Sequence, residues 1–164
     1  DQAVGSPYAS FLALMAYEEL KVDYPAANIL SSAIQKFQLS GGGYSNEADA
    51  KSATVPATVA GIVLAQQFNC PIASQTVDWL VGQHRERGGF AVSSEAPESD
   101  LLSTATALHA LRRTGVDIRA TGDRCLSFIE NCWRQDGGFS SHPEDSQTDC
   151  EYTFYALLGL GCLI

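Results

Sequence analysis

The sequence is organised by a glycine pair followed by an aromatic residue, which occurs three times. The copies lie at 41–44 (Gly-Gly-Gly-Tyr), 88–90 (Gly-Gly-Phe) and 137–139 (Gly-Gly-Phe). The two glycines directly before each aromatic begin at 42, 88 and 137, so the pairs are 46 and then 49 residues apart. A period of this length is typical of proteins built from repeated helix pairs. Two glycines after a helix permit a left-handed C-cap and the close approach of a neighbouring element. This repeat limits the possible folds more than any other feature of the chain.

Each turn lies between two stretches of helical character. The expected helices before the turns are 27–38, 73–84 and 120–134, and those after them are 54–67, 101–114 and 149–162. A further apolar stretch at 7–20 has the character of the second half of a repeat. No period-two alternation lasts long enough to indicate a strand. The sequence therefore predicts an all-α fold of α/α hairpin repeats with roughly seven helices.

The two kinds of helix differ in composition. Those after the turns are apolar around most of their circumference, which suits an inner layer, and those before the turns carry more charge, which suits an outer layer. One inner and one outer helix per repeat gives a curved double layer, either a solenoid or part of a closed ring. We expect residues 1–164 to form one repeat domain that is incomplete at both ends, so that self-association, further repeats or a second subunit would complete it.

The four apolar stretches share a polar residue at their start. Ser6, Thr54, Asp100 and Asp149 hold this position, and the last three stand ten residues after the aromatic of each turn. Their side-chain oxygens can accept the free N–H groups of a first helical turn. We therefore expect all four residues to be N-caps.

Composition excludes several classes of function. The net charge is −9 over 164 residues, which disfavours binding to nucleic acid or to an anionic membrane. No apolar run reaches the ~20 residues of a membrane span, and no signal peptide stands at the N-terminus. Five cysteines without Cys-x-x-Cys spacing indicate neither a disulfide framework nor a zinc finger. These features predict a protein of the reducing cytoplasm.

The third repeat resembles a known family. Trp-Arg-Gln-Asp-Gly-Gly-Phe at 133–139 is followed by Asp-Cys-Glu-Tyr-Thr-Phe-Tyr-Ala-Leu-Leu-Gly-Leu at 149–160. This pattern is similar to the repeat shared by the β subunits of protein prenyltransferases and by squalene and terpene cyclases, and the likeness covers nearly the whole chain. It implies an α/α toroid, a ring of helical hairpins around a central cavity, of which this chain would supply about half.

The resemblance also implies a site at the start of the last helix. In protein prenyltransferases an Asp and a Cys two residues later bind zinc, together with a His from a later repeat. The matching residues are Asp149 and Glu151, so a carboxylate stands where the family has a thiolate, and His142 or another chain would supply the third ligand. Asp100 matches a diphosphate-binding His of the family. The resemblance places Tyr152 and Tyr155 against a bound isoprenoid.

The same residues also have purely structural interpretations. Asp149 and Asp100 would cap helices with or without a ligand, because Ser6 and Thr54 occupy the same position. A negative charge at Glu151 would interact favourably with the dipole of the helix. His142 could simply be exposed to solvent in its loop, and Tyr152 and Tyr155 could be ordinary core residues. The sequence leaves both interpretations open.

Two classes of function follow. The first is a prenyltransferase-like protein that binds or transfers an isoprenoid, with zinc as cofactor. The second is a non-catalytic α/α repeat domain that binds a protein partner or an apolar ligand. Neither an Asp-x-Asp-Asp nor an Asp-Asp-x-x-Asp motif occurs, so no acid is present to start a cyclisation and terpene cyclase activity is not expected.

Overall fold

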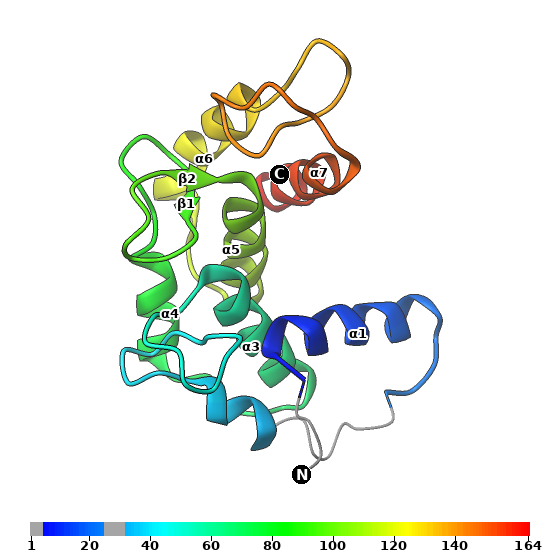
Figure 1. Ribbon diagram of the computed structural model, residues 1–164, viewed down its shortest axis with the longest axis vertical. Coiled ribbons are helices and arrows are strands. Elements are labelled where there is room, and N and C mark those ends of the chain that lie inside the picture. Colours follow the sequence, from blue (N-terminus) through cyan, green and yellow to red (C-terminus); the bar gives the residue numbers. More distant parts are fainter. Residues whose placement is uncertain (1–4, 25–31) are drawn as a thin grey trace. The chain divides into compact units, whose positions relative to one another are not determined.

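The computed structural model describes residues 5–24 and 32–164 (Figure 1). Its helices are α1 (Pro7–Glu19), the 3₁₀ segment η1 (Gln35–Phe37), α3 (Val55–Gln67), α4 (Ser74–Val81), α5 (Leu101–Thr114), α6 (Arg119–Asn131) and α7 (Cys150–Leu163). The expected helix at 27–38 falls partly outside the described residues, and its described part is helical from 32 to 37. The all-α prediction is confirmed. No helix in the described ranges is long and apolar enough to cross a membrane.

Four helices begin where the sequence predicts a cap. The side chains of Ser6, Thr54, Asp100 and Asp149 each accept a hydrogen bond from the backbone N–H three residues further on. Each cap satisfies an N–H that the helix itself cannot pair, a contribution of about 1 kcal/mol. The cap prediction is therefore confirmed at all four positions.

The three glycine turns share one backbone geometry. In the second turn, the Arg85 N–H donates to the Gly89 carbonyl at 3.0 Å and the Gly88 N–H donates to the Arg85 carbonyl at 2.9 Å, and the matching residues of the other turns make the same two bonds. The first glycine of each pair, Gly42, Gly88 and Gly137, has φ of 97°, 96° and 97°. This left-handed conformation strains residues with a Cβ, which explains why glycine stands there.

The aromatic residue after each turn is buried and held by a threonine. Phe90 is 1% exposed, and its N–H donates to the Thr104 hydroxyl at 2.9 Å. Tyr44 and Phe139 are held in the same way by the threonines that occupy the matching position in α3 and α7. Burying such a ring stabilises the fold by about 2 kcal/mol, so each turn is anchored to the helix that follows it.

Two short strands were not predicted. Strand β1 (Phe90–Ala91) pairs antiparallel with β2 (Ser99–Asp100), with Phe90 opposite Asp100. The third repeat has the same pairing as a single bridge between Phe139 and Asp149. Strands of two residues are too short to show an alternating pattern in the sequence. The pairing closes the loop between the aromatic and the cap residue.

The chain divides into two compact units, Asp1–Leu80 and Val81–Ile164. In the first unit α1 packs against α3, and in the second α7 packs against both α5 and α6 (Figure 1). Leu101, Leu108 and Leu111 of α5 are at most 2% exposed and form the core of the second unit. The contact of α6 with α7 joins the helices before and after one turn, as expected for a helical hairpin.

Candidate functional site

Asp149 stands at the N-terminus of α7 as its cap. Its Oδ1 accepts the Tyr152 N–H at 2.7 Å, and its backbone carbonyl accepts the Thr153 hydroxyl at 2.7 Å. Asp100 has the same two partners at the start of α5, the Ser103 N–H and the Thr104 hydroxyl. Both aspartates of the predicted site therefore have a structural role in the fold.

An arginine that the sequence interpretation did not select holds the loop in front of α7. The Arg134 guanidinium donates to the carbonyl oxygens of Asp145, His142 and Pro143, at 2.9, 3.2 and 2.6 Å. Arg85 does the same in the preceding repeat, where it donates to the carbonyls of the loop before α5. An Arg three residues before the glycine pair in two repeats was the signal that could have identified it.

This loop also contacts the start of α5. The Leu101 N–H donates to the Ser141 carbonyl at 2.8 Å, which brings the loop beside Asp100. Burial raises the pKa of Asp100, opposed by the Ser103 hydrogen bonds at the cap and by the charge of His142. The loop thus places His142 within electrostatic reach of Asp100, although the two are far apart in sequence.

Tyr152 lies among the acidic residues of this region. Burial raises its pKa most, followed by the negative charges of Asp100, Asp149, Glu151 and Asp145. The structure therefore gathers Asp100, Asp149, Glu151 and Tyr152, with His142 beside them, at the N-terminal ends of α5 and α7. An environment of this charge favours cations and disfavours the phosphates of a diphosphate.

The remaining predicted residues are placed as follows. Tyr155 is 6% exposed and packs edge-on against the Phe154 ring, with 5.3 Å between the ring centroids. The His142 Nδ1 accepts the Glu144 N–H at 3.2 Å. Within residues 5–24 and 32–164, no three His, Cys, Asp or Glu side chains form a group that could hold a metal ion.

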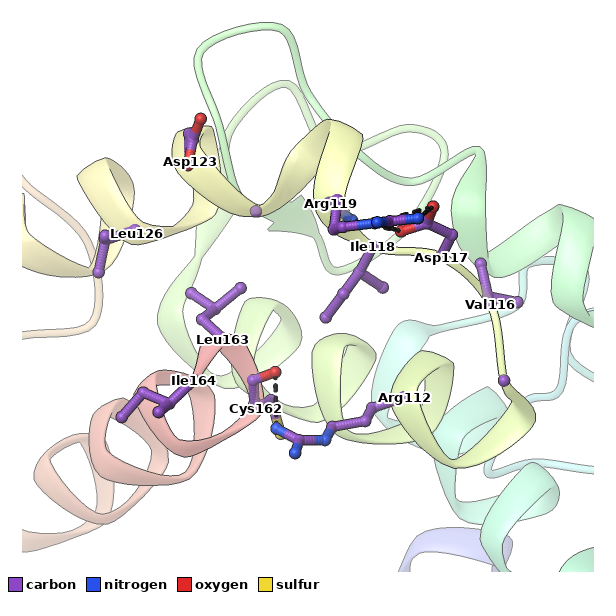
Figure 2. A pocket seen from close by; sticks show the side chains of 12 residues that line it. Arg112, Val116, Asp117, Ile118, Arg119, Asp123, Leu126, Cys162, Leu163 and Ile164 are labelled. Carbon is purple, nitrogen blue, oxygen red and sulfur yellow. Dashed lines mark hydrogen bonds and ion pairs between the residues drawn. The ribbon is translucent and has the colours of Figure 1, made fainter.

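Three hollows border α7 in the second unit. One of about 560 Å³ lies at the third turn, between Gly137 and Phe154. A second of about 540 Å³ lies where α5 meets α7 and is lined by His109, Leu157 and Leu158. The largest of the three, about 620 Å³, lies at the far end of α7 and contains none of the predicted site residues (Figure 2).

The hollow between α5 and α7 is apolar along α7 and basic along α5. The pKa of His109 is lowered by burial and then by the charge of Arg113. Arg112 lies in the same wall. Its guanidinium donates to the Gly161 carbonyl at 2.8 Å and to the Cys162 carbonyl at 3.0 Å, the bond drawn in Figure 2, near the C-terminal end of α7. The leucines of α7 give this hollow one apolar wall, which faces the two arginines of α5.

The sequence matches a family described as the prenyltransferase alpha-alpha toroid domain, over residues 6–163. The chain belongs to this family. It is also similar in structure to the Candida albicans protein geranylgeranyltransferase-I complexed with GGPP, with a TM-score of 0.75 and 20% sequence identity. The match covers 96% of this chain and 49% of that chain, so this chain spans about half the length of its structural neighbour. No curated protein matches the sequence.

The family assignment confirms the resemblance inferred from the three repeats. At 20% identity the structural neighbour shows a common fold and nothing further. The helical repeat, the turns and the caps of this toroid family member are thus accounted for by residues common to the repeats.

Proposed function

We propose that this chain is an isoprenoid-binding part of a prenyltransferase-like protein, in which the rest of the ring is supplied by further repeats or by a second subunit. The observation that carries the proposal is the hollow between α5 and α7, whose α7 side is formed by Leu157 and Leu158. It lies between two consecutive inner helices of a toroid family member, and the structural neighbour is a complex with an isoprenoid diphosphate.

The chain's own residues would act on such a ligand in two ways. The leucines would remove the hydrocarbon from water, with a gain of roughly 25 cal/mol for each Å² of apolar surface buried. His109, kept neutral by burial beside Arg113, would contribute a ring face and no charge. The acidic group at the N-terminal ends of α5 and α7 would keep a diphosphate away from that end of the helices.

Zinc forms the second part of the proposal. Asp149 and Glu151 would hold the ion, with His142 as the third ligand, and two carboxylates with an imidazole are donors that zinc accepts. These three side chains do not form a metal group as the described residues stand, so His142 would have to move toward the two carboxylates on binding. One oxygen of Asp149 accepts a backbone N–H, which leaves its other oxygen for a metal. The His142 Nδ1 accepts the Glu144 N–H, so His142 would have to give up this hydrogen bond to ligate zinc. Bound zinc would supply a Lewis acid able to lower the pKa of a substrate thiol.

A titration with GGPP and with its uncharged alcohol tests the proposal. We expect both compounds to bind, measured by calorimetry, and Leu158→Ser to weaken both about tenfold, because a buried leucine contributes roughly 1.5 to 3 kcal/mol. Leu163→Ser, a half-buried leucine of the same helix that lies outside this hollow, is the matched control and should leave binding unchanged. Absence of binding by both compounds would contradict the proposal.

The same titration, repeated with zinc, separates the two parts of the proposal. If Asp149 holds zinc, one equivalent should bind, and Asp149→Asn should remove it while the asparagine still caps α7. The second candidate function is a non-catalytic binding domain, favoured by the four carboxylates around Tyr152. Binding of the alcohol but not of GGPP, without zinc, would support that alternative.

A further inference from the structure

The imidazole of His84 is packed into the second turn without a hydrogen bond for its inner nitrogen. His84 follows the end of α4, and its ring lies edge-on against the Phe90 ring, with 5.3 Å between the centroids and 73° between the planes. Its Nε2 is buried and, among residues 5–24 and 32–164, has no hydrogen-bond partner. Buried polar atoms without a partner are uncommon in folded proteins, so this one requires an explanation.

The matching positions of the other two repeats do not have this feature. In the first repeat, Gln38 donates its Nε2 to the Thr76 hydroxyl of α4 at 3.0 Å. In the third repeat, Trp133 is 50% exposed and packs on Phe139 with nearly the geometry of the histidine, 5.0 Å and 71°. The side chain at this position therefore has a protein partner in the first repeat and solvent in the third.

Helix α6 shows why His84 lacks the partner that Gln38 has. A Cβ added to Gly88 would lie 2.2 Å from the Arg124 carbonyl oxygen, so α6 lies directly on the second turn. The next residue of α6 is Cys125, which is fully buried and occupies the place that Thr76 has in α4, because each follows the residue whose carbonyl lies over the turn. A thiol is a weaker hydrogen-bonding group than a hydroxyl, so the bond seen in the first repeat has no equivalent here.

The charges that act on this imidazole are positive. Burial lowers the pKa of His84 most, followed by the charge of Arg124 on α6 and then by that of Arg85 in the turn itself. The Phe90 side of the ring offers an aromatic edge and no charge. Protonation would place a further positive charge beside two arginines and would make both ring nitrogens donors, one of them buried without an acceptor. The closed turn therefore requires the neutral form of His84.

His84 is connected to the start of α5 through β1. Its backbone forms an antiparallel bridge with Phe90, and Phe90 pairs with Asp100, the cap of α5. The Ala91 N–H donates to the Gln83 carbonyl at 3.1 Å, which holds β1 against the same segment. A displacement of the His84 ring would therefore reach the cap of α5 through one intervening residue.

We propose that His84 is an acid-sensitive switch in the second turn: the neutral imidazole keeps the turn closed against α6, and its protonation opens the turn and releases the pairing of β1 with β2. The opening is local, because the third turn has a tryptophan at this position, which gains no proton in the same pH range. The inference does not depend on isoprenoid or zinc binding, since it rests on the packing of one side chain.

Amide exchange of the full chain, followed by NMR, tests the proposal. The rates at about pH 7.5 and about pH 5.5, on either side of the ordinary histidine pKa, are corrected for the intrinsic effect of pH on exchange. One linked proton can favour opening by at most about tenfold for each pH unit. We expect the amides of Phe90 and Ala91 to open about three to ten times more often at the lower pH, and the amide of Phe139 in the third turn to show no such increase.

Variants that copy the other repeats identify the group responsible. His84→Gln places the residue of the first repeat in the second turn, and His84→Trp places that of the third. Each should remove the increase, and the use of both keeps the test valid if one of them fails to fold. Trp133→His is the matched control, because an imidazole at this exposed position can be protonated in solvent and should leave the Phe139 amide unchanged.

Three results would overturn the proposal. Equal acceleration in the second and third turns would mean that acid opens more than one turn, and an increase that persists in both His84 variants would assign it to another group. The same increase in Trp133→His would show that burial is not the cause. A titration of the ring protons adds a second readout, in which a pKa of 6.5 or above for His84 would also contradict the proposal.

Discussion

The second and third turns of this molecule have the same backbone and different surroundings. Gly88 and Gly137 have φ values of 96° and 97°, and both turns make the same pair of backbone hydrogen bonds. Among residues 5–24 and 32–164, a helix lies against the glycines of the second turn and none lies against those of the third. The difference shows that the turn conformation comes from the residues of the repeat itself and does not need the neighbour that it accommodates.

The comparison also separates two reasons for glycine. At Gly137 the left-handed conformation is a sufficient reason, whereas at Gly88 the backbone of α6 leaves no room for a Cβ. A side chain at each position would therefore have different consequences, and three experiments can break or sharpen this contrast.

Replacement of the glycines by alanine should give the largest effect. Gly137→Ala introduces left-handed strain of about 1 kcal/mol. Gly88→Ala introduces the same strain and a collision with the Arg124 carbonyl, for a total of about 2 to 4 kcal/mol. Urea unfolding followed by circular dichroism measures both values. Equal losses of stability would mean that α6 does not press on the second turn.

Replacement of the threonines should give a smaller contrast. Thr104→Val leaves the buried Phe90 N–H without an acceptor, which costs about 1 to 3 kcal/mol. Thr153→Val removes the matching bond to the part-buried Phe139 N–H, for which we expect about 1 kcal/mol or less. The same unfolding measurement applies. A larger loss for Thr153 would show that the third turn is already covered in solution.

The smallest expected effect is on how stability depends on pH, through the carboxylates of Asp100 and Asp145. Burial raises the pKa of Asp100 above its ordinary value of 3.8, so the stability of the native chain relative to Asp100→Asn is greatest below that pH and falls as pH rises through the raised pKa. The Ser141 hydroxyl lowers the pKa of Asp145, so its advantage over Asp145→Asn is present above pH 3.8 and is lost as pH falls.

Unfolding of the native chain and the two variants across the acidic range gives both difference curves. Their slopes should have opposite signs. Parallel curves would show that the burial of Asp100 does not control its ionisation.

Much of the fold follows from local residues and could be predicted. The glycine pairs, the four caps and the apolar stretches each have a direct physical effect on nearby backbone, so α5 begins and ends where the sequence predicts. The pairing of β1 with β2 could not be predicted in the same way, and neither could the hydrogen bonds from Arg134 to its loop. Both features depend on where a loop folds back. They use backbone N–H and C=O groups, which every residue has, so no sequence pattern marks them.

The predicted site also has one part that follows from local residues and one part that depends on how a loop folds back. Asp149 and Asp100 could be placed as caps from their position alone, and they are caps. That His142 lies within reach of Asp100 depends on the bond from Leu101 to Ser141, which joins two repeats. Zinc or ligand binding depends on groups that are not part of the chain, so it stays a prediction for Asp149, Glu151, His142, Asp100, Tyr152 and Tyr155.

Arg85 and Arg134 hold their loops through main-chain oxygens, which every amino acid possesses. These contacts to each loop therefore do not depend on which side chains the contacted residues carry. Substitutions between the aromatic and the cap can change the charge and shape of the rim without disturbing the helices beneath. In these two repeats the charge of the loop can therefore change while its arginine still holds the main chain in place.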